Sequence, residues 1–126
     1  MKLKTLLVIA AVIFIPFGVG LLFVATPLMS VYGLTLDQDA NVVARIFGAA
    51  LIGYCAMNWT ARNAPASEPQ RPIVLNNFLF HLIAFFPALL GTLSGVLNGL
   101  GWSSVIIHFL LTVGFGYFLF IKQSEA

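Results

Sequence analysis

The stretch LKTLLVIAAVIFIPFGVGLLFVAT, from Leu3 to Thr26, is long and apolar enough to decide what kind of protein this is. A helix needs about 20 consecutive apolar residues to cross the hydrocarbon core of a bilayer. Lys2 and Lys4 stand at the start of the run, so a signal peptide is the alternative interpretation. We favour a retained membrane helix, because the run is long for a signal peptide and the residues around Pro27 make a poor cleavage site.

The composition of the whole chain points the same way. Of its 126 residues, 60% are hydrophobic and 8% are charged, and the mean hydropathy is +1.02. Soluble domains carry about 25% charged residues, so this chain has too few polar side chains to coat a water-soluble globule. The sequence predicts a single all-α domain, an integral membrane four-helix bundle, with spans at about residues 3–26, 40–61, 72–94 and 102–121.

Prolines, glycines and capping residues set the expected boundaries. Pro16, with Gly18 and Gly20, predicts a kink in the middle of the first span, and Pro27 predicts its end. The next residues are expected to form an interfacial turn, and Thr35-Leu36-Asp37-Gln38 matches a capping box that starts the second span. Residues 62–71 read as a polar loop, residues 95–101 as a glycine turn and residues 122–126 as a polar tail.

The basic residues predict the topology. Lys and Arg gather on the cytoplasmic side of membrane proteins. With the N-terminus inside, every basic residue that flanks a span falls on the inner side, while Asp37 and Asp39 fall outside. The sequence therefore predicts an N-in/C-in, multi-pass membrane protein. Because the charges are scattered, we expect no nucleic-acid partner. The flanking basic residues are Lys2, Lys4, Arg62, Arg71 and Lys122.

Arg45 is the one charged residue well inside a predicted span. A charge there is costly and by default suggests a functional site. Helical spacing puts Asn41, Arg45, Gly48 and Ala49 on one face, and Ala49 with Gly53 makes a small-xxx-small pair, so we expect this face to meet neighbouring helices. Arg45 and His108 have similar estimated depths. The candidate ligand-binding residues are Arg45, His108, Asn41 and Ser104, and the candidate helix-packing residues are Gly48, Ala49, Gly53, His81 and Asn77.

The alternative for Arg45 is an anchoring role. Its side chain is long enough to reach the headgroups from about 8 Å below the membrane surface. There it would pair with Asp37, with Asp39 or with backbone carbonyls. In that case the charge stabilises the bundle at the interface and marks no site.

The two histidines lie on the inward faces of the third and fourth spans. Two membrane histidines can be the axial ligands of a haem, which requires both at one level. The estimated levels of His81 and His108 differ by about 7 Å, so we expect hydrogen bonds between helices instead. Two histidines are also too few for a closed metal site. No cofactor and no metal are predicted, although bound lipid fits the composition. Phe80 and Phe86 are expected to face lipid.

Neither a catalytic constellation nor a transport signature is present in the sequence. No Asp or Glu lies within a predicted span, whereas proton-coupled transporters use such a carboxylate. The chain contains no GxSxG, HExxH, Walker or CxxC motif. The lone Cys55 predicts no intramolecular disulfide and reads as a buried thiol. The chain is therefore expected not to be an enzyme.

Several stretches resemble a broad group of small bacterial four-span proteins of unknown function. They are Tyr32-Gly33-Leu34-Thr35-Leu36-Asp37, residues 44–53 (ARIFGAALIG), Trp59 with Ala61-Arg62, and residues 93–102 (LSGVLNGLGW). The likeness covers nearly the whole chain, and its most specific part is the arginine with Gly48-Ala49-Ala50 close behind it. It implies a bacterial inner-membrane four-helix protein and no particular activity. A weaker likeness to DoxX-like proteins rests on size and topology alone.

Three functions follow as hypotheses. The first is a non-enzymatic accessory or structural subunit that packs against a larger membrane complex or against itself. The alternative is a protein that binds a lipid, a quinone or another small amphiphile near Arg45 and His108. The third and least favoured is a haem-bearing electron-transfer subunit.

Overall fold

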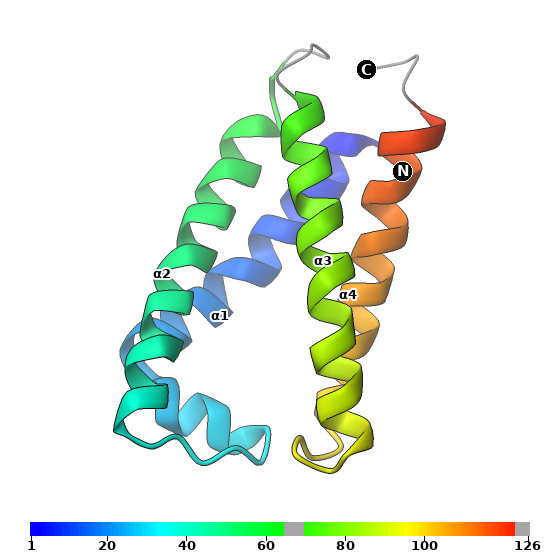
Figure 1. The fold of residues 1–126 in the computed structure, drawn as a ribbon. Helices are drawn as coiled ribbons and strands as arrows, with labels where there is room; N and C mark the ends of the chain where they lie inside the picture. The colour runs from blue at the N-terminus through cyan, green and yellow to red at the C-terminus, as the bar shows by residue number, and fades with distance from the viewer. Residues whose placement is uncertain (65–69, 123–126) are drawn as a thin grey trace.

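The computed structural model describes residues 1–64 and 70–122, which form four helices lying side by side (Figure 1). All four are long and apolar enough to cross a membrane, as the sequence predicts. The predicted polar loop falls partly, at residues 65–69, outside the described residues, as does most of the polar tail, at residues 123–126. The helices are α1 (Leu3–Val31), α2 (Gln38–Ala61), α3 (Gln70–Leu93) and α4 (Gly101–Gly116), which the π-helix η1 (Tyr117–Ile121) extends.

Helix α1 bends later than expected and continues past its predicted end. Its backbone leaves the helical region at Val24, with φ −136° and ψ 46°, and Pro16 lies within regular helix. Pro27 does not end the helix, contrary to the prediction. It falls in the first turn of the helix that resumes after Val24, where a missing N–H costs nothing because that turn has no acceptor for it. The expected interfacial turn is therefore shorter and starts at Tyr32.

Helix α2 starts from a different cap than the one predicted. The Asp37 side chain accepts a hydrogen bond from the Ala40 backbone N–H at 2.7 Å. Asp37 is thus the N-cap, and Thr35 is not, so the capping-box prediction is wrong. A carboxylate in this position also complements the positive end of the helix dipole.

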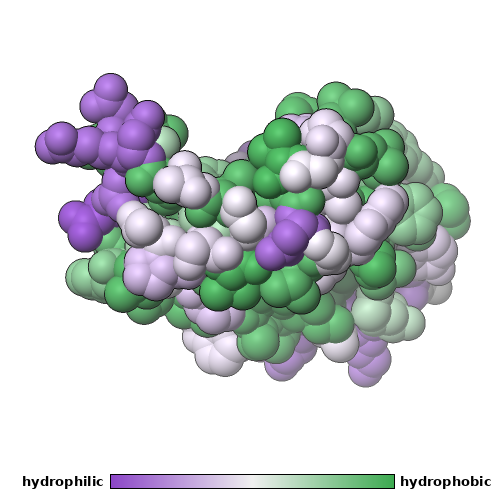
Figure 2. Space-filling model, turned by 90° about the horizontal axis from the view of Figure 1, so that it is seen from below, coloured by the Kyte–Doolittle hydropathy of each residue, from purple (hydrophilic) through white to green (hydrophobic). Residues whose placement is uncertain are grey.

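Among the described residues, the charges that flank the helices separate along the bundle axis. We call the end that holds the start of α1, the end of α2, the start of α3 and η1 the basic end, and the opposite end, with the α1–α2 and α3–α4 connections, the turn end (Figure 1). Figure 2 looks onto the turn end, where most of the strongly hydrophilic side chains gather at one edge, a smaller hydrophilic patch lies near the middle, and the rest of the face ranges from pale to green. Asp37 and Asp39 belong to the turn end, and the five flanking basic residues belong to the basic end.

The bundle consists of two helix pairs. Helix α1 packs along α2, and α3 packs along α4, whereas contacts between the pairs are sparse. Helix α1 approaches α2 closely at Gly48, where an added Cβ would lie 2.6 Å from the Leu22 backbone nitrogen and 2.7 Å from the Gly18 carbonyl oxygen. The prediction that Gly48 packs against another helix is therefore confirmed.

Two other predicted packing positions on α2 make no such contact within this chain. Ala49 is exposed, and a Cβ added at Gly53 would meet nothing within 4 Å. The buried face of α2 runs through Gly48, Leu51 and Asn58, which turns Ala49 and Gly53 outward. The small-xxx-small interpretation is therefore wrong for the contacts of this chain.

Hydrogen bonds link the two pairs at both ends. Near the basic end, the Asn77 side-chain amide of α3 donates to Oδ1 of Asn58 at 2.9 Å, and the Asn58 amide donates back to Oδ1 of Asn77 at 3.2 Å. Both side chains are fully buried, which confirms Asn77 as a packing residue. At the turn end, the Asn98 backbone donates to the Tyr32 carbonyl at 2.9 Å, and the Asn98 side chain donates to the Val31 carbonyl at 2.8 Å. We call these contacts the amide pair and the Asn98 latch.

Candidate functional site

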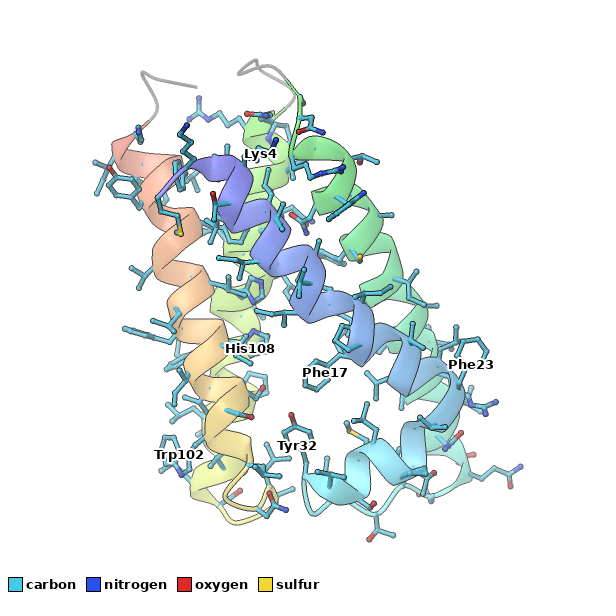
Figure 3. All side chains as sticks on the ribbon, turned by 180° about the vertical axis from the view of Figure 1, so that it is seen from behind. Lys4, Phe17, Phe23, Tyr32, Trp102 and His108 are labelled. Atoms are coloured by element: carbon cyan, nitrogen blue, oxygen red, sulfur yellow. The ribbon has the colours of Figure 1, made fainter. Side chains whose placement is uncertain are left out.

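A cavity of about 270 Å³ lies between the two helix pairs, on the turn-end side of the amide pair. Its walls are mostly apolar, with aromatic side chains from three helices. Four polar side chains reach it, namely Tyr32, His81, Ser104 and His108. Figure 3 shows Phe17 on α1, His108 on α4 and Tyr32 below them around the same space. Ligand sites typically combine such apolar walls with a few convergent polar groups.

An aromatic cluster forms the wall nearest the middle of the bundle. The Phe14 ring stacks on the His81 ring with centroids 5.4 Å apart, and Phe80 meets Tyr54 at 4.9 Å and His81 at 5.1 Å. The prediction that Phe80 faces lipid is therefore wrong, whereas Phe86 is 55% exposed as expected. Burying these rings together fixes the position of His81.

The two histidines meet directly. The Nδ1 atoms of His81 and His108 are 2.9 Å apart, and the His81 side chain is only 1% exposed. The predicted hydrogen bonding between helices is confirmed. The two side chains are therefore closer together than the estimated levels suggested. His81 is also confirmed as a helix-packing residue.

This geometry does not suit the haem hypothesis. Two imidazoles on opposite sides of one metal ion need their ligating nitrogens about 4 Å apart, since each metal–nitrogen bond is about 2.0 Å long. The observed 2.9 Å between the Nδ1 atoms is a hydrogen-bond distance. Within residues 1–64 and 70–122, no group of three or more His, Cys, Asp or Glu side chains is placed to hold a metal ion.

Of the four predicted ligand-binding residues, two line the cavity and two do not. His108 and Ser104 both face it. Asn41 instead donates a 2.7 Å hydrogen bond to the Thr26 hydroxyl, which ties the start of α2 to the end part of α1. Arg45 is exposed on the outside of α2, and it is the neighbouring Ala44 that lines the cavity.

The expected link between Arg45 and His108 is therefore wrong. Similar depth places two residues at one level but does not place them on facing sides of their helices. Arg45 lies about 10 Å along α2 from its first residue, within reach of the membrane surface. Its guanidinium makes none of the hydrogen bonds or ion pairs found among the described residues, so the predicted pairing with Asp37 or Asp39 is absent there too.

Sequence reasoning missed Tyr32, Phe14, Phe17 and Phe80 as cavity residues. Tyr32 was interpreted as part of an interfacial turn, and the phenylalanines carry no signal in helices that are apolar all round. The one available clue was the polar spacing of Ser104 and His108, one turn apart on α4, which did identify the correct face.

The cavity offers hydrogen bonds without charge. No Lys, Arg, Asp or Glu is among the described residues that line it. No model of a protein family, no curated protein and no solved structure matches this chain. The resemblance to small four-span proteins therefore stays a prediction, and the chemistry of the cavity carries the functional argument.

Proposed function

We propose that this chain is a non-enzymatic, four-span membrane protein that binds one small amphiphile in the cavity between its helix pairs. The observation that carries the proposal is the convergence of Tyr32, Ser104 and His108 on an otherwise apolar space of about 270 Å³. A cavity of about 150 Å³ lined by apolar side chains holds a benzene molecule, so this one has room for a larger ring or a short acyl chain.

A cavity-filling variant tests this proposal. We expect Ala44→Leu to reduce retention of the native ligand or lipid at least about tenfold, because the larger side chain occupies the cavity from the α2 side. The measurement is native mass spectrometry of protein released from membranes of its own host without overexpression. The masses bound to the two proteins are compared directly.

Ala49→Leu is the matched control. It makes the same substitution on the same helix, at an exposed position outside the cavity lining. It is expected to retain the same bound mass as the unmodified chain. Equal retention by Ala44→Leu and Ala49→Leu would count against the cavity as the binding site.

We also propose that the protein lies in a bacterial inner membrane with both termini in the cytoplasm. The gathering of the five flanking basic residues at the basic end supports this orientation. In a Cys55→Ala background, we expect Gly99→Cys to react with a membrane-impermeant thiol reagent in spheroplasts, and Asn63→Cys to react only after lysis. Gly99 has open space around it and Asn63 is exposed, so neither thiol should be shielded by the fold. The reverse pattern of labelling would contradict the orientation.

A role as an accessory subunit of a larger complex stays a prediction. The exposed apolar side chains on α2, including Val43 and Ile46, suit lipid as well as a protein partner. Purification from native membrane at the mass of the chain alone, or of a homo-oligomer, would speak against that role.

A further inference from the structure

The cavity presents hydrogen-bond donors in particular. The hydroxyls of Tyr32 and Ser104 make no hydrogen bond to any other described residue, although both side chains line the cavity. The nearby Ser103 differs, because its hydroxyl donates to the Leu100 carbonyl at 2.6 Å. Figure 3 shows the oxygen of Tyr32 directed into the space between α1 and α4. Both hydroxyls are therefore available to a ligand.

The histidine pair adds a third donor, whose identity follows from burial. Nε2 of His81 is fully buried and has no hydrogen-bond partner. A hydrogen on that atom would be a buried N–H without an acceptor, which native structures avoid more strongly than an unpaired acceptor. We therefore place the proton of His81 on Nδ1, from which it is donated to Nδ1 of His108, 2.9 Å away.

The tautomer of His108 then follows. Its Nδ1 accepts the hydrogen bond from His81, so in the neutral ring the proton resides on Nε2. His108 is only half buried and lines the cavity, so this N–H can serve a ligand. The cavity thus offers a fixed N–H donor and two hydroxyls.

The walls restrict the ligand further. An anionic headgroup in an apolar space needs a cation, and none lines the cavity. Arg45, the natural candidate, lies outside it. The rings of Phe14, Phe17, Phe47 and Phe80 offer flat apolar surfaces. Such walls favour a planar ring over a bulky branched group.

We propose that the cavity selects an uncharged, flat ring compound that carries a carbonyl oxygen, held by hydrogen bonds from His108 Nε2, Tyr32 and Ser104. The inference rests on the proposed function and narrows it from any small amphiphile to a neutral hydrogen-bond acceptor. The hydrogen bond between the Nδ1 atoms of His81 and His108 orients the Nε2–H donor of His108. The hydroxyls of Tyr32 and Ser104 supply the other donors of the cavity.

Three probes on one ring system test the selection. They are 2-acetylnaphthalene, which has a carbonyl, 2-ethylnaphthalene, which lacks one, and 2-naphthoate, which is an anion. Binding is measured by equilibrium dialysis against protein in phosphatidylcholine nanodiscs, with empty nanodiscs subtracted. We expect 2-acetylnaphthalene to bind about tenfold more tightly than 2-ethylnaphthalene, as one or two net hydrogen bonds provide, and 2-naphthoate to bind most weakly.

Variants assign the preference to its donors. His108→Phe and Tyr32→Phe should each reduce the preference for the acetyl probe over the ethyl probe about threefold or more, and Ser104→Ala should also reduce it. The controls are Tyr117→Phe, on η1 at the basic end, and Ser103→Ala, whose hydroxyl already has a backbone partner. Both should keep the preference of the unmodified chain. Tyr32→Phe preserves the histidine pair, so the test does not depend on His108→Phe folding.

The outcomes separate the two proposals. Equal binding of the acetyl and ethyl probes, or a preference that survives both His108→Phe and Tyr32→Phe, overturns the carbonyl selection and leaves amphiphile binding in place. Tightest binding by 2-naphthoate overturns the selection of a neutral group. If none of the three binds more to protein nanodiscs than to empty ones, both the selection and the proposed cavity function fail.

Discussion

Gly48→Ala is expected to lower the free energy of unfolding by about 1–3 kcal/mol, which is a large share of a typical total of about 5–15 kcal/mol. The new methyl group would lie 2.6 Å from the Leu22 nitrogen and 2.7 Å from the Gly18 carbonyl oxygen. Both are backbone atoms of α1, so no side chain can rotate away to make room. The two helices must therefore move apart at this contact.

Gly53→Ala is the matched control for this prediction. It adds the same methyl group to the same helix at a site where nothing lies within 4 Å. Since alanine favours helix over glycine, this variant should gain up to about 1 kcal/mol. Unfolding of both variants in mixed micelles of dodecylmaltoside and dodecyl sulfate, followed by circular dichroism, gives the comparison. Similar unfolding of the two variants would mean that α1 and α2 do not approach as described.

The amide pair should show strong non-additivity. Asn58→Leu or Asn77→Leu alone leaves a buried amide without its partner, which costs about 1–3 kcal/mol. The double variant replaces both amides by apolar side chains of similar shape and should be no less stable than the worse single variant. Each amide also donates to a carbonyl of its own helix, Asn58 to Tyr54 and Asn77 to Ile73, so the pair is fully satisfied as it stands.

Asn76→Leu controls for the loss of an asparagine. Asn76 is exposed next to Asn77 and accepts only a long, 3.4 Å hydrogen bond from the Tyr54 hydroxyl. Its substitution should change the stability by less than about 0.5 kcal/mol. The same unfolding measurement applies to all four variants. A double variant that loses the sum of the two single losses would contradict a coupled pair.

The sequence predicted the spans well and the breaks within them poorly. Long apolar runs leave a membrane helix as the main option, so the predicted bounds were close to those observed for α2, for α3 and for α4 together with η1. The sequence placed the bend of α1 at Pro16, whereas the structure has it at Val24. A proline inside a helix disrupts it only where the fold does not accommodate the ring, and the sequence does not show where that is. Which proline bends the chain depends on packing, and α1 keeps helical backbone angles where Leu7, Ala10 and Phe14 are buried.

Helix faces were harder to predict than helix bounds. In a helix that is apolar all round, periodicity does not show which side is inward. The positions of small residues were used instead to predict the inward face of each helix. This succeeded at Gly48 and failed at Ala49 and Gly53, because a small residue that faces outward cannot be told from an inward one in the sequence. Asn77, His81 and His108 were correctly turned inward because an amide or imidazole in lipid needs a partner. The Arg45 side chain can reach the membrane surface at the turn end. It therefore needs no partner inside the bundle, and the need for a partner did not predict its orientation.

The Asn98 latch and the amide pair also determine how a ligand would arrive. Together they join the two helix pairs at both ends of the space between them, so the approach left to a ligand is from the sides of the bundle, which face hydrocarbon in a membrane. In a bilayer, a ligand would then enter by lateral diffusion within one leaflet. The fraction of occupied cavities would then depend on the number of ligand molecules per lipid molecule. Diluting a suspension of loaded membranes with buffer would leave this fraction unchanged, whereas adding empty membranes would lower it.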